Sequence, residues 1–177
     1  MGKRERLICL LEEQLPEVDL ETAKRAVSQA VFLTTERESC DLFKALSVHV
    51  EVEYSLSEIC FCKAESQQDC LYGTLAVPRI LDVLGKRHQI AYVVTERYLI
   101  FIDNTDFTGR MIRQIRVKRA QQRMRRERFL YYFMLELMAK DSVLLQSFIL
   151  YLAGSSHRRE SATICLYNHQ NHPAGGS

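Results

Sequence analysis

Residues 86–107, K-R-H-Q-I-A-Y-V-V-T-E-R-Y-L-I-F-I-D-N-T-D-F, decide the fold that the sequence predicts. Two apolar runs, I-A-Y-V-V and Y-L-I-F-I, are separated only by T-E-R. Both runs have the composition and length of strands, and the short polar connection fits a tight hairpin. We therefore expect adjacent strands over 87–94 and 98–102. The D-N-T-D cluster that follows is expected to turn the chain from the second strand into a helix.

The residues before this hairpin add strands to the same sheet. Residues 71–77, L-Y-G-T-L-A-V, have strand composition and end at Pro78. Residues 58–63 and 48–54 alternate between apolar and polar side chains, as a half-buried strand does, although 48–54 also fits a linker. Residues 66–69, S-Q-Q-D, are typical of a turn. The central block therefore predicts a meander of three or four antiparallel strands.

The N-terminal part predicts two more strands and two short helices. Asp19 is a suitable N-cap for the first helix. Leu42, Phe43 and Leu46 have the spacing of one helical face in the second. We expect strands over 7–11 and 30–35, and helices over 20–28 and 39–47.

The period changes to a helical one after the hairpin. Asn104 or Thr105 can cap a helix whose first turn holds Asp106, because acids are favourable near the positive end of a helix. The apolar face of this helix is expected to comprise Met111, Ile112, Ile115 and Val117.

A long C-terminal helix is predicted over 126–152. Its apolar stripe comprises Leu130, Phe133, Met134, Leu137, Leu144, Leu145, Phe148 and Leu152. Asp141 falls on this stripe and interrupts it, and Glu136, Lys140 and Asp141 would make a membrane span costly. Residues 153–177 lack periodicity and are rich in Ser, His, Asn and Gly. We therefore expect one domain over 5–152, and a disordered or non-native polar tail over 153–177.

Charge is distributed unevenly along the chain. Residues 110–128 carry nine basic side chains and one acid, so this segment is +8 while the whole chain of 177 residues is only +2. We name these nine residues the basic stripe: Arg110, Arg113, Arg116, Lys118, Arg119, Arg123, Arg125, Arg126 and Arg128. The stripe is either a solvated helix face, a surface that meets an acidic neighbour, or a surface for nucleic-acid phosphates. Nucleic acid is disfavoured, because the sequence provides neither an aromatic platform nor a reader motif.

Two sets of soft-metal ligands occur, and both have a simpler interpretation. Cys60 and Cys62 would share one face of a strand, with Cys70 further along the chain, but no second close pair with zinc spacing is present. Buried or half-buried thiols are the simpler interpretation of these cysteines. The histidines of the polar tail, which lack an ordered frame, are His157, His169 and His172.

Carboxylates give the sequence its candidate Mg²⁺ ligands, which are Asp103, Asp106 and Asp141. The alternative is turn and capping chemistry for the first two and a helix-surface acid for the third. The sequence has no glycine-rich phosphate loop, HExxH motif or nucleophile elbow, so we do not expect an enzyme. Three of the six cysteines lie inside apolar runs, which indicates reduced thiols and a cytoplasmic protein.

Three blocks of the chain resemble a known family. They are L-Y-G-T-L-A-V-P-R (71–79), the strand pair with its flanks (85–107), and R-E-R-F-L-Y-Y-F-M-L-E-L-M-A-K-D-S-V-L-L (126–145). Together they resemble the N-terminal cytoplasmic domain of CorA-like magnesium transporters, especially forms common in Firmicutes. The matching positions are Gly73, Thr74, Pro78, Phe101, Ile102, Asp103, Glu127, Arg128, Phe129, Leu130, Tyr131, Phe133, Leu135, Glu136, Leu137, Asp141, Leu144 and Leu145.

The resemblance covers roughly residues 5–150 and implies an α/β/α sandwich, here with a largely antiparallel central sheet and a long C-terminal helix. In such families this domain leads into a stalk helix and two membrane helices with a Gly-Met-Asn motif, and cytoplasmic Mg²⁺ between the subunits of a pentamer favours the closed state. The stalk, the membrane spans and the motif are missing from this sequence. We therefore expect a chain that is truncated before them and cannot transport ions alone.

The function that the resemblance implies is that of a regulatory, Mg²⁺-sensing cytoplasmic domain. Its expected cofactor is weakly bound Mg²⁺, and its expected partners are further copies of itself or full-length transporter subunits. The alternative is a small nucleic-acid-binding or interaction protein that uses the basic stripe.

Overall fold

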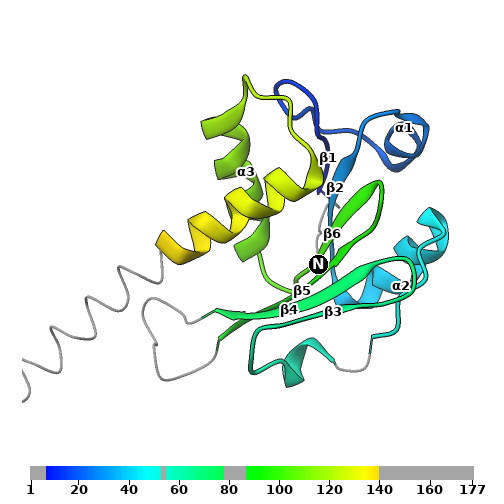
Figure 1. The fold of residues 1–177 in the computed structure, drawn as a ribbon, viewed down its shortest axis with the longest axis vertical. Coiled ribbons are helices and arrows are strands. Elements are labelled where there is room, and N and C mark those ends of the chain that lie inside the picture. Colours follow the sequence, from blue (N-terminus) through cyan, green and yellow to red (C-terminus); the bar gives the residue numbers. More distant parts are fainter. Residues whose placement is uncertain (1–6, 53–54, 78–86, 140–177) are drawn as a thin grey trace, which may run out of the picture. The chain divides into compact units, whose positions relative to one another are not determined.

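The computed structural model describes residues 7–52, 55–77 and 87–139. Six strands form one sheet in the order β1-β2-β6-β5-β4-β3 (Figure 1). The strands are β1 (Leu7–Leu10), β2 (Ala30–Thr34), β3 (Lys63–Ser66), β4 (Leu71–Val77), β5 (His88–Val94) and β6 (Tyr98–Ile102). The helices are α1 (Leu20–Arg25), α2 (Glu36–Leu46), the short 3₁₀ helix η1 (Leu56–Glu58) and α3 (Phe107–Arg119), and residues 126–139 are also helical.

The sheet is largely antiparallel, as predicted. Strands β3 to β6 form a four-stranded meander, and β1 pairs antiparallel with β2. Only β2 and β6 pair in parallel, with Phe32 opposite Ile100. The hairpin between β5 and β6 closes through the Thr95 N–H, which donates to the Tyr98 carbonyl at 2.9 Å. The two central strands and β4 lie within one residue of their predicted bounds.

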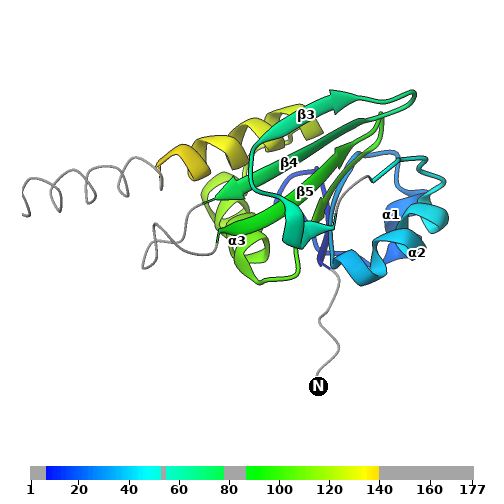
Figure 2. The same cartoon turned by 90° about the horizontal axis from the view of Figure 1, so that it is seen from below.

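Alternate side chains of the sheet enter two separate cores, so the fold has three layers. On one face, Leu99 and Phe101 pack with α3 and with the helical segment 126–139. On the other face, Phe32 and Ile100 pack with α1, α2 and η1. Figure 2 shows the two groups of helices on opposite sides of the sheet. The expected α/β/α sandwich is confirmed.

The strand predicted over 58–63 is wrong. Residues 56–58 form η1, and β3 begins only at Lys63. The cause is local, because Ser55 and Glu58 form a capping box in which each side chain accepts a backbone N–H of the other end. Of the apolar residues in this stretch, Ile59 is buried, but Phe61 is 54% exposed. Residues 48–52 form no strand, which agrees with the linker alternative; residues 53–54 lie outside the described ones.

The predicted helices differ from the observed ones mainly at their ends. Asp19 caps α1 by accepting the Thr22 N–H at 2.7 Å, but α1 ends at Arg25 instead of residue 28. Helix α2 starts three residues earlier than predicted, at Glu36. Asp106 is the N-cap residue of α3 by position, but its side chain makes no capping hydrogen bond, and the hydroxyl of the predicted Thr105 accepts the Phe107 N–H at 3.2 Å. Val117 was placed wrongly on the apolar face of α3, since it is 83% exposed.

The helical segment 126–139 packs on the sheet through Phe129, Phe133 and Leu137. The predicted stripe members Leu130 and Met134 are only partly buried, at the edge of this core. Phe129, which the prediction omitted, is fully buried. The rest of the predicted helix, with Leu144, Leu145, Phe148 and Leu152, and the tail over 153–177 lie outside the described residues. Within 7–52, 55–77 and 87–139, no helix has the length and apolarity that crossing a membrane requires.

Gly73 leaves space for a tyrosine ring on the neighbouring strand. It lies opposite Tyr92 in the β4–β5 pair, and a Cβ added at Gly73 would lie 2.2 Å from Cζ of the Tyr92 ring. The Tyr92 side chain is itself buried, at 6% exposure. The ring therefore occupies the space that any side chain at position 73 would need.

We expect Gly73→Ala to lower the free energy of unfolding by about 1–3 kcal/mol, because the tyrosine ring must leave a packed position. Urea denaturation of the purified protein measures this change. Tyr92→Leu in the Gly73→Ala background should recover part of the loss, because the shorter leucine side chain leaves room for the added Cβ. An equal loss with and without Tyr92→Leu would contradict the proposed clash.

Candidate functional site

The structure assigns Asp103 a role in the backbone rather than an open ligand position. Its side chain is 2% exposed and lies at the end of β6. One carboxylate oxygen accepts the N–H and the hydroxyl of Thr105, each at 2.7 Å. The other oxygen accepts the Thr108 N–H in the first turn of α3 at 2.9 Å. This carboxylate therefore shares the capping of α3 with the Thr105 hydroxyl, which accepts the Phe107 N–H at 3.2 Å.

Asn104 instead caps the neighbouring helix. Its side-chain oxygen accepts the Glu36 N–H at 3.0 Å, at the first residue of α2. The reason is the parallel pairing of β2 with β6, which brings the carboxyl ends of both strands to one edge of the sheet. Residues 68 positions apart in the sequence therefore meet there.

The other candidate Mg²⁺ ligands are not brought together with Asp103. Asp106 is exposed, and its carboxylate lies 3.5 Å from the Arg113 guanidinium. Asp141 lies outside the described residues. Among the residues that the structure describes, no group of three or more His, Cys, Asp or Glu side chains is placed to hold a metal ion.

The expectation of buried or half-buried thiols is wrong for two of the three cysteines of the zinc alternative. Cys60 and Cys62 are exposed, whereas Cys70 is buried and its sulfur contacts the His49 carbonyl. Burial, with a smaller contribution from Asp69, raises the pKa of the Cys70 thiol, which disfavours the thiolate that binds metal. The histidines of the tail, His157, His169 and His172, lie outside the described residues.

Four residues of the basic stripe on α3 are engaged by contacts within the protein, three with carboxylates and one with an aromatic ring. Arg113 pairs with Asp106, as stated above. The Arg116 guanidinium lies 3.1 Å from the Glu17 carboxylate, and the Lys118 ammonium lies 2.6 Å from that of Glu136. The Arg119 guanidinium lies over the Tyr132 ring, 4.3 Å from its centre. These contacts tie α3 to its neighbours and leave less free charge than the sequence suggests.

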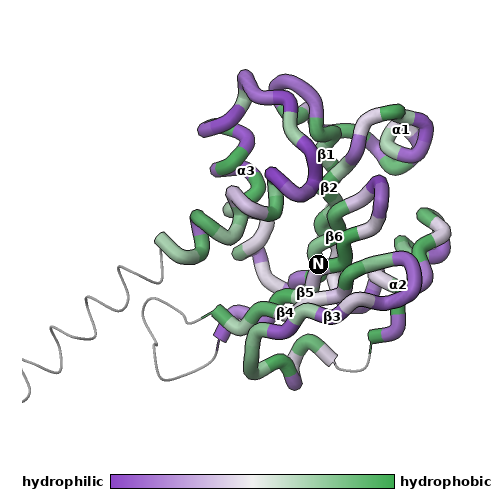
Figure 3. Tube along the Cα trace, in the orientation of Figure 1, coloured by the Kyte–Doolittle hydropathy of each residue, from purple (hydrophilic) through white to green (hydrophobic). Residues whose placement is uncertain are grey.

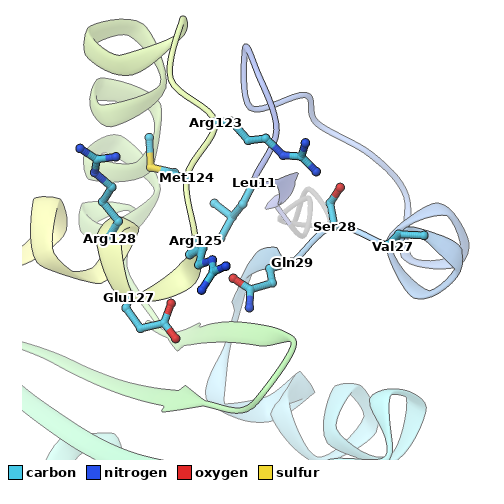
Figure 4. A pocket seen from close by; sticks show the side chains of 9 residues that line it. All are labelled: Leu11, Val27, Ser28, Gln29, Arg123, Met124, Arg125, Glu127 and Arg128. Carbon is cyan, nitrogen blue, oxygen red and sulfur yellow. The ribbon is translucent and has the colours of Figure 1, made fainter.

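Three further arginines of the basic stripe, Arg123, Arg125 and Arg128, line a cleft that the sequence did not predict. A cavity of about 720 Å³ lies between the loop before β2 and the segment that links α3 to the helix at 126–139 (Figure 4). We name it the basic cleft. Its lining residues are Leu11, Val27, Ser28, Gln29, Arg123, Met124, Arg125, Glu127 and Arg128. In Figure 3 the link after α3 is largely hydrophilic. In the sequence, the density of arginines over 123–128 indicates one wall of this cleft. It does not indicate the second wall.

Comparisons with known proteins support the fold. No protein-family model matches the sequence, and a search of curated proteins gives no match. Among solved structures, the soluble domain of CorA from Methanocaldococcus jannaschii matches with a TM-score of 0.61 at 16% sequence identity. The chain has the fold of the CorA soluble domain. The complete structure of the CorA magnesium transporter from the same organism matches with a TM-score of 0.62 at 15% identity.

The two matches cover most of this chain but only part of each CorA chain. Each match covers 89% of this chain, but only 52% of the complete CorA chain and 65% of the soluble-domain chain. The chain therefore spans between half and two thirds of the length of the CorA structures that it matches. The resemblance drawn from the sequence is confirmed for the fold, whereas the Firmicutes type stays a prediction.

Proposed function

We propose that this chain serves as the cytoplasmic, regulatory domain of a CorA-like magnesium transporter. The observation that carries the proposal is the match of 89% of the chain to the soluble domain of CorA. The expected partners are further copies of this domain or full-length transporter subunits. The complete CorA structure that the chain matches is that of a magnesium transporter, so a non-enzymatic role is part of the proposal.

The part of this proposal that concerns Mg²⁺ needs revised ligands. Asp103 is a poor candidate, because both of its oxygens already accept backbone N–H groups. Asp106 is exposed and accessible to an ion at a subunit interface. Asp106 and Asp141 are therefore the acids that we propose to test.

The ion pairs of the basic stripe weaken the nucleic-acid alternative. Arg113, Arg116 and Lys118 each have a carboxylate partner within the protein. Counterion release by phosphate contacts requires basic side chains that are free to make them. We therefore retain the transporter domain as the single proposed function.

Thermal unfolding across a Mg²⁺ series tests the proposal. A ligand that binds only the native state adds about 1.4 kcal/mol of stability at ten times its dissociation constant. For a protein of this size each kcal/mol raises the Tm by about 2–4 °C. We expect a saturable rise of this order between zero and tens of millimolar Mg²⁺, with Ca²⁺ and NaCl of equal ionic strength as references.

Matched variants identify the ligands in the same experiment. Asp106→Asn and Asp141→Asn should reduce the Mg²⁺-dependent rise, whereas Asp41→Asn, at an exposed position of α2, should not. Sedimentation at each Mg²⁺ concentration would show whether subunits associate. A rise no larger than that in NaCl, with no change in association, would contradict the Mg²⁺-sensing function.

A further inference from the structure

Three arginines of the basic cleft have no acidic partner among the residues that the structure describes. They are Arg123, Arg125 and Arg128, and all three are exposed. The single acid in the lining is Glu127, whose carboxylate is already engaged 2.8 Å from the Arg126 guanidinium. The cleft therefore has uncompensated positive charge, whereas Arg113, Arg116 and Lys118 of α3 each have a carboxylate partner.

The side chains of the cleft come from two walls that are far apart in the sequence. In Figure 4, Arg123 and Arg125 extend toward Ser28 and Gln29, whereas Arg128 extends to the other side of its segment. Two guanidinium groups thus face one space from the same wall. Guanidinium groups present planar sets of donors that match phosphate oxygens, so this arrangement suits a phosphate better than a monovalent halide.

Hydrogen bonds hold both walls in place without a ligand. The Gln29 side-chain oxygen accepts the Arg126 N–H at 3.0 Å, and its amide nitrogen donates to the Glu96 carbonyl at 3.1 Å. The Gln14 N–H donates to the Ala120 carbonyl at 2.5 Å. Met124 is buried at 5% exposure and anchors the link between its two arginine neighbours. A binding site that is already formed loses little entropy when it binds a ligand.

We propose that the basic cleft binds a phosphate-bearing small anion, with Arg123 and Arg125 as the main ligands to the phosphate. The volume of about 720 Å³ is in the range of small-molecule sites. The helix that begins at residue 126 adds the favourable end of its dipole to this wall. Of the apolar residues in the lining, Val27 is fully exposed and available to the rest of the ligand, whereas Leu11 is buried at 2% exposure. This proposal stands on the cleft alone and does not require the transporter function.

Calorimetric titration with inorganic pyrophosphate tests the proposal on the full chain. We expect saturable binding that Arg123→Gln/Arg125→Gln weakens at least tenfold. The matched control is Arg37→Gln/Arg110→Gln, which removes the same charge at two exposed positions on α2 and α3 outside the cleft, and it should bind as the original chain does. Val27→Glu places an acid in the cleft and should also weaken binding. It keeps the test decisive if the double variant does not fold.

A second arm separates a free phosphate compound from a lipid headgroup. Vesicles of phosphatidylcholine with phosphatidylglycerol are compared with vesicles of phosphatidylcholine alone by co-sedimentation. Vesicle binding that is lost in Arg123→Gln/Arg125→Gln and kept in the control would assign the cleft to a headgroup.

Three results would overturn the proposal. The first is the absence of saturable binding to both pyrophosphate and anionic vesicles. The second is an equal loss in the cleft and control variants, which would mean that net charge attracts anions without a site. The third is retention of duplex DNA by the original chain without any pyrophosphate binding, which would favour a nucleic-acid surface.

Discussion

Replacing Phe133 with alanine should lower the free energy of unfolding by about 3–5 kcal/mol. Phe133 is fully buried, and its ring centre lies 4.4 Å from that of Phe101 in β6. The substitution removes a large apolar side chain between the sheet and the helical segment 126–139, and the surrounding core can fill the cavity only in part. Since a domain is stable by only about 5–15 kcal/mol, this one change removes a large share of the stability.

Urea denaturation, followed by circular dichroism, measures this loss. The matched control is Tyr131→Ala, two residues away in the same helical segment, because Tyr131 is 59% exposed. The control should change the free energy of unfolding by about 0.5 kcal/mol or less. If both variants were equally destabilised, the packing of this helical segment on β6 would be wrong.

Replacing Asp103 with alanine should cost about 2–4 kcal/mol of stability. The carboxylate accepts two backbone N–H groups and one hydroxyl, and its loss leaves the buried Thr108 N–H at the start of α3 without its acceptor. Hydrogen bonds to a charged group contribute more than neutral ones, and a buried donor without an acceptor adds a desolvation cost. The same urea experiment measures the loss.

Two further variants separate this capping role from ion binding. Asp106→Ala, at an exposed position three residues away, should change stability by about 0.5 kcal/mol or less, because exposed ion pairs contribute little. Asp103→Asn should fall between the two, since an amide offers one acceptor oxygen where the carboxylate uses two. Loss of stability in Asp103→Ala only when Mg²⁺ is present would instead indicate that Asp103 is an ion ligand.

Asp103 was a candidate Mg²⁺ ligand because of its residue type and its place in the D-N-T-D turn. Carboxylates in a D-N-T-D turn serve equally well as ion ligands or as caps, and the residue types do not distinguish these uses. Burial distinguishes them here, because Asp103 is 2% exposed and has its acceptors filled by the chain itself. Asp106, with its side chain exposed, is the acid of this turn that remains available.

The sequence by itself determined the elements whose signals are local. Strands β4, β5 and β6 follow from runs of apolar and β-branched residues, and the T-E-R connection fixes a hairpin because so short a link permits only antiparallel neighbours. Asp19 was identified as a helix cap for the same reason, since its partner is three residues away. The resemblance of three sequence blocks to CorA-like transporters then predicted the three-layered fold.

The tertiary structure alone decided everything that depends on pairing between distant segments. The parallel pairing of β2 with β6 joins residues about 68 positions apart, and it is the reason that Asn104 caps α2. The basic stripe was one run of charge in the sequence, but acids at positions 17 and 136 neutralise part of it. Arg123, Arg125 and Arg128 line a cleft only because the loop at Ser28 and Gln29 forms the opposite wall. Charge along a chain is a local property, whereas the partners of each charge are chosen by the packing.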